Sequence, residues 1–164
     1  MEVLRKASGL DDLQLIHELA HRIWWPTYQD YLDPLQIETM LDDMYSVSSL
    51  RRQQVAGITF VLWCPEGIPS GFIGYGPSKD AQVMRIEKIY ILPEAQGQGG
   101  GSMLLEHVAE EAIQQRIPVL ELNVNRYNPA QHFYTRQGFH LVKEMDIPYG
   151  SFVLNDYVMA KKLF

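Results

Sequence analysis

The sequence lacks several features that would each indicate a particular class of protein. It has one cysteine, Cys64, so no disulfide can form within the chain. No apolar run approaches the roughly 18 residues of a membrane-spanning helix. The first six residues, MEVLRK, contain no apolar segment of a secretion signal. From these absences we expect a cytoplasmic protein with no membrane partner.

Basic residues are also scarce. The 164 residues include 14 Lys and Arg against 20 Asp and Glu, a formal net charge of −6. Because a nucleic-acid clamp needs clustered Lys and Arg, no nucleic-acid partner is expected. The whole acidic excess lies in residues 1–45. This segment either forms solvated helix faces and caps, or an acidic wall that attracts a cationic small molecule. Candidates for such a wall are Asp30, Asp33, Asp42 and Asp43.

What the chain does contain is typical of one globular unit. Hydrophobic residues make up 46% of it and charged residues 21%. At roughly 150 residues per domain, and with no repeat or linker, the length predicts a single domain over residues 1–164.

The hydrophobic pattern predicts a mixed order of strands and helices. Apolar residues recur at helical spacing from Leu13 to Trp24, and Asp33 is expected to cap a helix beginning at Pro34, with Gln36 completing a capping box. Alternating or continuous apolar runs predict strands. The expected elements are a strand at 2–7, helices at 13–24, from 34 and at 48–57, strands at 58–64, 70–76 and 82–92, a helix at 101–115, a strand at 118–124, a helix at 129–137, and strands at 139–146 and 152–162. This order favours an α+β (mixed α/β) fold over a doubly wound one.

A glycine-rich segment, residues 96–102 (QGQGGGS), connects a predicted strand to a predicted helix. Glycine lets backbone N–H groups approach a ligand, and a helix N-terminus adds partial positive charge, so the segment suits a pyrophosphate. A P-loop would need a Lys after Gly101, and a dinucleotide fingerprint would need glycine instead of Ser102. A third pattern, (R/Q)-x-x-G-x-(G/A), fits at Gln96, Gly99 and Gly101.

This third pattern is found in the GCN5-related N-acetyltransferase (GNAT) family, and the rest of the chain also resembles that family, over nearly its whole length. Individually weak segments occur in the family's order: 89–93, 96–101, 122–124, 128–134 and 138–139. The spacing between Asn128 and Ala130 is one residue shorter than in the family. Gln96 replaces the commoner Arg, and Gly100 replaces a branched apolar residue, so we expect a looser helix start. The segment 146–159 is similar to bacterial polyamine-type acetyltransferases.

The resemblance implies the GNAT fold, a central mixed, mostly antiparallel sheet of about seven strands with flanking helices and a splayed parallel pair, here 82–92 and 118–124. Acetyl-CoA would lie in that opening. The resemblance implies these cofactor-binding residues: Ile89, Tyr90, Ile91, Gln96, Gly97, Gln98, Gly99, Gly100, Gly101, Ser102, Asn128, Phe133 and Tyr134. Asn128 is equally suited to capping the helix that follows it.

Two residues are catalytic candidates through the resemblance. In the family an amine attacks the thioester directly and an acid protonates the leaving thiolate, a role that falls to Tyr134. Residue type alone favours packing beside Phe133 instead. Glu87 lies two residues before Ile89, hence on the same face of a regular strand, and is a candidate base. The alternative is a surface Glu paired with Arg85 or Lys88.

The first predicted helix, at 13–24, carries a zinc-protease signature, HExxH, at residues 17–21. No metal is expected, because a third ligand and the metzincin continuation are missing, and a zinc hydrolase is only a distant alternative. Since the first two helices border the acceptor in the resembled family, the substrate-binding candidates are Trp24, Trp25, Tyr28 and Tyr31, with His17 and His21 left open. Packing is the alternative for each.

We therefore expect an N-acetyltransferase that moves the acetyl group of acetyl-CoA to a primary amine. A small cationic amine or polyamine is the first candidate acceptor, and a protein amine the second. The alternative from another class is a CoA-binding regulatory or sensor module without turnover, against which Tyr134 argues. The sequence identifies neither the amine, the base nor the oligomeric state, although a homodimer is the family's common habit.

Overall fold

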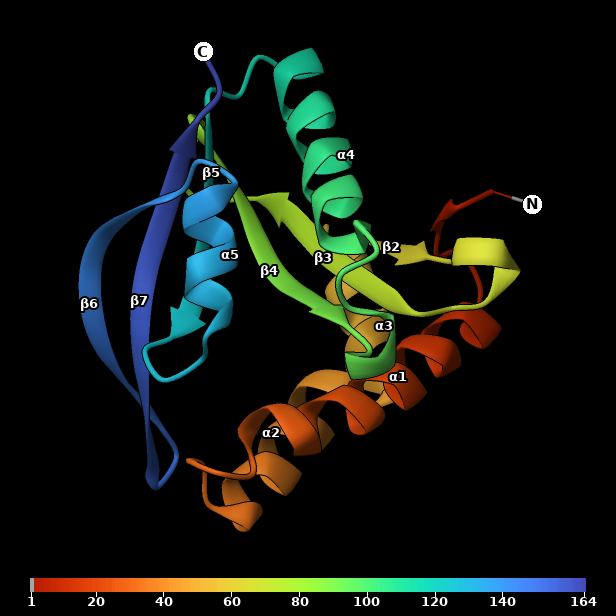
Figure 1. Cartoon of the computed structure of the whole chain (residues 1–164), viewed down its shortest axis with the longest axis vertical. Helices are drawn as coiled ribbons and strands as arrows, with labels where there is room; N and C mark the ends of the chain where they lie inside the picture. Colours follow the sequence, from red (N-terminus) through yellow and green to blue (C-terminus); the bar gives the residue numbers. More distant parts are fainter. Residues whose placement is uncertain (1) are drawn as a thin grey trace.

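A seven-stranded sheet forms the centre of the molecule in the computed structural model, which describes residues 2–164 (Figure 1). The strand order is β1-β2-β3-β4-β5-β7-β6, and every neighbouring pair is antiparallel except β4 and β5. The mixed, mostly antiparallel sheet is therefore confirmed. The strands are β1 (Leu4–Lys6), β2 (Thr59–Trp63), β3 (Gly71–Pro77), β4 (Val83–Ile91), β5 (Val119–Asn125), β6 (His140–Tyr149) and β7 (Phe152–Lys162).

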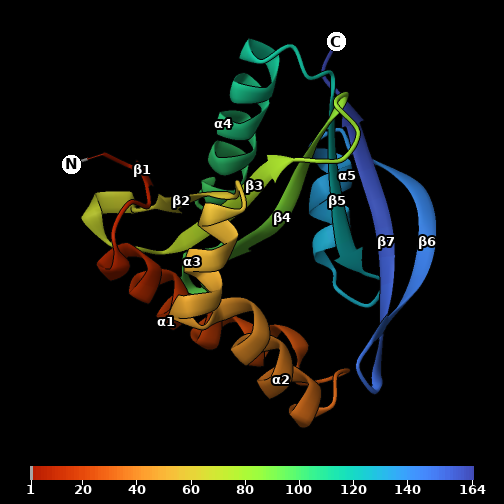
Figure 2. The ribbon, with the colours of Figure 1, turned by 180° about the vertical axis from the view of Figure 1, so that it is seen from behind.

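Five α-helices cover the two faces of the sheet. One face carries α1 (Leu10–Tyr28), α2 (Pro34–Tyr45) and α3 (Val47–Val55), and the other carries α4 (Gly100–Gln114) and α5 (Ala130–Arg136), as Figures 1 and 2 show. Short 3-10 turns occur at Pro65–Gly67 and Pro93–Ala95. Within residues 2–164 no helix has both the length and the apolarity that crossing a membrane requires.

Helix boundaries show where local signals were insufficient. Helix α1 begins at Leu10 and continues through Pro26 to Tyr28, beyond the predicted 13–24. Pro26 lies in the last turn, where one missing N–H donor interrupts little of the helix. The cap at Asp33 is confirmed, because its Oδ1 accepts the Leu35 N–H at 2.8 Å. The prediction that Gln36 completes a capping box is wrong, because its amide nitrogen lies 3.7 Å from the Met40 sulfur.

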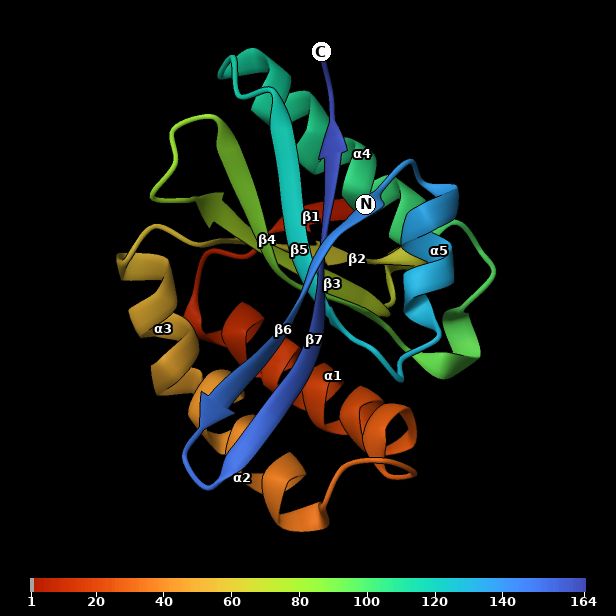
Figure 3. The same ribbon diagram turned by 90° about the vertical axis from the view of Figure 1, so that its left-hand side faces the viewer.

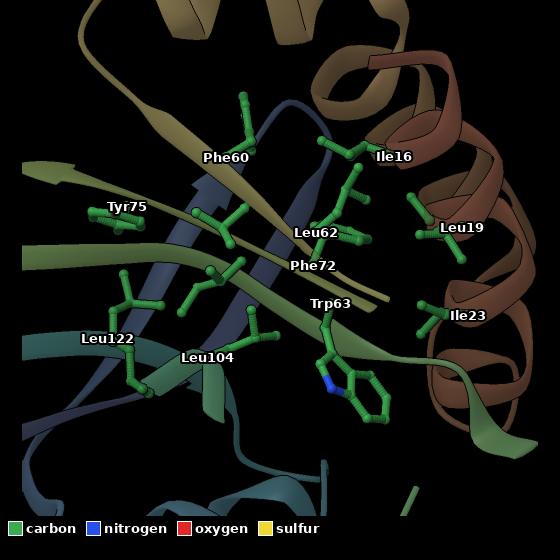
Figure 4. Close-up of a cluster of buried hydrophobic side chains, with 14 of the residues drawn as sticks. Ile16, Leu19, Ile23, Phe60, Leu62, Trp63, Phe72, Tyr75, Leu104 and Leu122 are labelled. Atoms are coloured by element: carbon green, nitrogen blue, oxygen red, sulfur yellow. The ribbon is translucent and has the colours of Figure 1, made fainter. Parts of the chain in front are cut away.

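The core lies on both sides of the central strands. Figure 4 shows Ile16, Leu19 and Ile23 of α1 directed at the sheet. Leu104 of α4 packs within the same hydrophobic cluster. These four side chains have exposed fractions of 3% or less, as expected from their helical spacing.

The parallel pair β4 and β5 diverges halfway along its length. Hydrogen-bonded pairing runs only from Val83 opposite Val119 to Ile86 opposite Leu122. Beyond that point β5 stays paired with β7 on its other side, while residues 88–91 of β4 stay paired only with β3. The splayed pair expected from the resemblance is therefore present, and it leaves open backbone groups on β4.

Candidate cofactor and acceptor site

One cavity of about 1180 Å³ begins at this divergence and extends between the helices of both faces. Its walls come from the ends of α1 and β4, one side of α2, the glycine-rich loop, the end of β5 and helix α5. Figure 3 looks onto β5, with α1 and α2 on one side of the sheet and α4 and α5 on the other. The cavity thus joins the predicted cofactor segments to the predicted acceptor helices.

The glycine-rich loop presents unused backbone donors to this cavity. Gly97 and Gly99 have φ values of 80° and 85°, a left-handed conformation that favours glycine. No side chain caps α4, whose first helical hydrogen bond runs from Met103 N–H to the Gly99 carbonyl. The N–H groups of Gly100, Gly101 and Ser102 therefore have no acceptor within the helix, and they make an anion site at its positive end.

Two glycines of this loop are required by close packing. A Cβ on Gly100 would lie 2.5 Å from the buried ring of Trp63, and a Cβ on Gly101 would lie 2.9 Å from the ring of Phe133. The expectation of a looser helix start at Gly100 is wrong. Trp63 occupies the volume that a branched residue would need, so the helix is held against β2.

A β-bulge changes the position of Glu87. Tyr75 pairs with Ile86 and Gly74 pairs with Lys88, so Glu87 is the extra residue of β4. Ile86 and Ile89 lie opposite Tyr75 and Ile73, which share one face of β3. The bulge interrupts the regular alternation from which the shared face of Glu87 and Ile89 was predicted.

Glu87 nevertheless lines the cavity and is exposed to it. The alternative pairing with Arg85 is absent, because Arg85 Nη1 lies 2.7 Å from Glu121 and Arg85 Nη2 lies 2.9 Å from Asn123. The bulge thus leaves a carboxylate without a guanidinium partner where β4 separates from β5.

Tyr134 lies in the cavity wall on α5, close to Phe133 and Phe139. Its side chain is almost fully buried, and burial raises the pKa of its phenol well above the usual range. The phenol is therefore protonated at neutral pH, which is the state that an acid requires.

Opposite α5, aromatic rings form the floor of the cavity. The hydroxyl groups of Tyr28 and Tyr90 are 2.8 Å apart, and burial raises the pKa of both phenols. The ring centroids of Trp24 and Tyr28 are 4.7 Å apart, and those of Trp24 and Tyr45 are 5.5 Å apart. This cluster joins α1 and α2 to β4.

Most predicted site residues line this cavity. Those that do are Trp24, Tyr28, Tyr31, Glu87, Ile89, Tyr90, Ile91, Gln96, Gly97, Gly99, Gly100, Gly101, Ser102, Asn128, Phe133 and Tyr134. Gln98 and Trp25 are not in its walls, and Trp25 instead packs against the core. Asn128 also caps α5, since its Oδ1 accepts the Ala130 N–H at 2.9 Å.

The histidines of the HExxH segment are engaged in helix packing. His17 Nδ1 lies 2.7 Å from the Tyr45 carbonyl, and His21 Nδ1 lies 2.8 Å from the His17 carbonyl. Across residues 2–164, no group of three or more His, Cys, Asp or Glu side chains is arranged to hold a metal ion. Neither histidine lines the cavity.

The hypothesis of an acidic wall formed by the four aspartates is largely wrong. Of its four candidates only Asp30 lines the cavity. Asp33 caps α2, and Asp43 Oδ2 accepts a hydrogen bond from the Tyr149 hydroxyl at 2.8 Å. Asp42 is exposed on α2 and lies outside the cavity wall.

Several lining residues were missed from the sequence. They are Gln36 of α2, Lys88 of β4, Tyr127 before α5, and Asp156 of β7. Burial raises the pKa of Asp156, against the opposing effects of the Asn123 hydrogen bond and the Arg126 charge. Only Lys88 carried a usable signal, as a charge within a strand of buried residues.

Comparisons with known proteins agree with this geometry. A family model described as the acetyltransferase (GNAT) family matches residues 16–139. The uncharacterized N-acetyltransferase YuaI of Bacillus subtilis is 30% identical over 142 residues, which are 82% of this chain and 78% of YuaI. Streptothricin acetyltransferase of Streptomyces lavendulae is 37% identical over 82 residues, which are 49% of this chain and 43% of that protein. The chain spans about half the length of the mycobacterial and streptomycete relatives that it matches.

Among solved structures, the PaiA N-acetyltransferase of Thermoplasma acidophilum, in complex with coenzyme A, superposes with a TM-score of 0.82. It is 25% identical, and the match covers 97% of each chain. The divergent strand pair, the uncapped glycine-rich helix start and the family match lead to one conclusion. The chain belongs to the acetyltransferase (GNAT) family.

Proposed function

We propose that the protein is an N-acetyltransferase that moves the acetyl group of acetyl-CoA to a primary amine. The observation that carries this proposal is one continuous cavity. It contains an open strand edge, an anion-binding helix start and a buried, protonated tyrosine. Together these elements suit the binding of a phosphate-bearing thioester and the protonation of its leaving thiolate.

The described residues fit acetyl-CoA, which supplies an activated acyl group and an anionic pyrophosphate. The N–H groups of the loop over 97–102 would bind the pyrophosphate, since nothing lies within 4 Å of an added Cβ at Gly97 or Gly99. Backbone groups of Ile89 and Ile91, on the edge that β5 leaves unpaired, would bind the pantetheine arm as an added strand.

The chain's own side chains supply the proton transfers. The amine nitrogen bonds to the acetyl carbon, and the bond from that carbon to sulfur breaks. Tyr134 gives its proton to the leaving thiolate, and Glu87 accepts a proton from the amine, directly or through a water. An N–H group of β4 near Ile89 would stabilise the charge that develops on the carbonyl oxygen.

A small cationic amine is the acceptor that the cavity's charges favour. Asp30, Glu87 and Asp156 line it, together with the aromatic rings of Tyr28 and Tyr31. Carboxylates and aromatic faces both attract an ammonium group. Streptothricin acetyltransferase, to which the chain is similar, has a small-molecule acceptor in its name. We place the reaction in the cytoplasm, on the composition described above.

Substitution of Tyr134 by Phe tests the proposal. Loss of the acid should lower kcat by roughly 100-fold or more while the affinity for acetyl-CoA changes little. Tyr127→Phe is the matched control, because Tyr127 is 65% exposed in the cavity wall and should keep its activity. Equal kcat values for the two variants would remove Tyr134 from this role.

A further inference from the structure

Lys88 is a cation on the inner side of the acceptor part of the cavity. Its exposed fraction is 9%, and it lines the cavity. Lys88 pairs with Gly74, and Tyr90 pairs with Phe72 two residues along β3, so the two side chains share one face of the sheet. Tyr90 contacts Tyr28 of α1, which identifies that face as the one covered by α1 and α2.

The ammonium group of Lys88 has an aromatic neighbour but no acceptor. Its Nζ lies 4.8 Å from the centroid of the Tyr45 ring, a cation–π contact. Among residues 2–164 it forms no ion pair within 4.0 Å, while Arg85, three residues earlier, has both Glu121 and Asn123. A buried ammonium with open N–H donors is complementary to an anionic oxygen.

We propose that Lys88 binds a carboxylate of the acceptor, so that the acceptor class is an amine that also carries a carboxylate, such as a diamino acid. This inference rests on the proposed function and narrows its substrate class. Asp30 and Asp156 in the same cavity are complementary to an ammonium group of such a molecule. The cavity therefore has charges of both signs for one zwitterionic ligand.

The position of Lys88 argues against a role in binding the cofactor phosphates. The uncapped N-terminus of α4 lies on the other face of the sheet, where Gly100 meets Trp63. Ile89, opposite Ile73, points to that face. Burial also lowers the pKa of Lys88 to about 8, and the neighbouring Glu87 charge only partly opposes this. A bound carboxylate would raise this pKa again by stabilising the ammonium form.

Matched pairs of acceptors test the inference. L-lysine and cadaverine differ only by the carboxylate, as do L-ornithine and putrescine. For the wild type we expect kcat/KM at least tenfold higher for the carboxylated member of a pair. Lys88→Met should reduce this ratio to near one, mainly through KM, and Lys88→Arg should restore part of it. Unchanged affinity for CoA shows that each variant is folded.

Each outcome bears on one claim. An equal kcat/KM for both members of each pair, or a ratio that survives in Lys88→Met, overturns the carboxylate inference while acetyl transfer itself stands. If no amine is acetylated, the proposed function fails, and calorimetry with the CoA-bound protein still tests Lys88. The carboxylate inference is supported if the amino acids bind at least tenfold more tightly than the diamines and this difference is lost in Lys88→Met. It is overturned if no carboxylated amine binds.

Discussion

The hydroxyl groups of Tyr28 and Tyr90 lie 2.8 Å apart and join the end of α1 to the free edge of β4. Tyr28 belongs to the proposed acceptor side, and Tyr90 to the strand proposed to bind the cofactor. The two ring centroids are 6.4 Å apart and nearly perpendicular, with an interplanar angle of 72°. One hydrogen bond thus connects the helix of the proposed acceptor side to the strand of the proposed cofactor side.

We expect Tyr28 and Tyr90 to be energetically coupled. A double-mutant cycle of Tyr28→Phe and Tyr90→Phe, read by urea unfolding, should give a coupling free energy of about 1 kcal/mol, because each single variant leaves one buried hydroxyl without its partner. Tyr28→Phe combined with Tyr127→Phe serves as the control cycle and should be additive. A coupling indistinguishable from zero would mean that the hydrogen bond does not contribute in solution.

Gly100 should be intolerant of any side chain. In Gly100→Ala the new Cβ would meet the Trp63 ring at 2.5 Å, and that ring is fully buried, so we expect a loss of about 1–3 kcal/mol in unfolding free energy. The affinity for acetyl-CoA should fall as well, because the loop amides would move. Gly9→Ala, with nothing within 4 Å of the added Cβ, should cost less, about 0.5 kcal/mol, because Gly9 is the N-cap of α1. Equal stability of the two variants would contradict the close packing.

Lys88 should make stability rise with pH. Its pKa is about 8 in the folded protein and 10.5 in the unfolded chain, so between these values the unfolded chain binds more protons. Relative to Lys88→Met, whose side chain does not titrate, the wild type should gain about 2 kcal/mol between pH ~7.5 and ~9.5. Subtracting the stability curve of Lys88→Met from that of the wild type cancels the contributions of the other titrating groups. These include the two neighbours of Lys88, Glu87 and Tyr45, which are present in both proteins. Parallel curves would mean that Lys88 keeps an ordinary pKa.

Among the early acidic residues, only Asp30 should affect the acceptor. Asp30→Asn removes a charge from the cavity wall and should raise the KM of a cationic amine about two- to fivefold, with no effect on the KM of acetyl-CoA. Asp42→Asn makes the same charge change on the exposed side of α2 and should leave both KM values unchanged. Equal effects of the two substitutions would indicate long-range attraction by net charge instead of a local contact.

Local patterns in the sequence were sufficient for the order of elements. Apolar spacing and helix-cap signals predicted every strand of the sheet and all five helices, and most of these elements bury an apolar face, although β6 is largely exposed. The glycine-rich segment predicted a helix start at 101, one residue from the observed Gly100, and the family resemblance located the cofactor side of the cavity wall. These features depend on residues close together in the chain.

The errors arose where distant residues decide the geometry. The bulge that displaces Glu87 comes from the pairing of β4 with β3, and the fit at Gly100 depends on Trp63 in β2. Asp43 was assigned to a substrate wall but bonds to Tyr149, far along the chain. Net charge in a segment gave no information about which acidic residues line the cavity, and only Asp30 of the four candidates does so.

Thiol release from acetyl-CoA in the presence of a panel of primary amines is the most direct test of the central claim. The proposed chemistry predicts free thiol and acetylated amine in equal amounts, with Tyr134→Phe much slower than the wild type. The panel should include the lysine and cadaverine pair. Measurable binding of CoA with no thiol release for any amine would contradict the claim and favour a CoA-binding module without turnover.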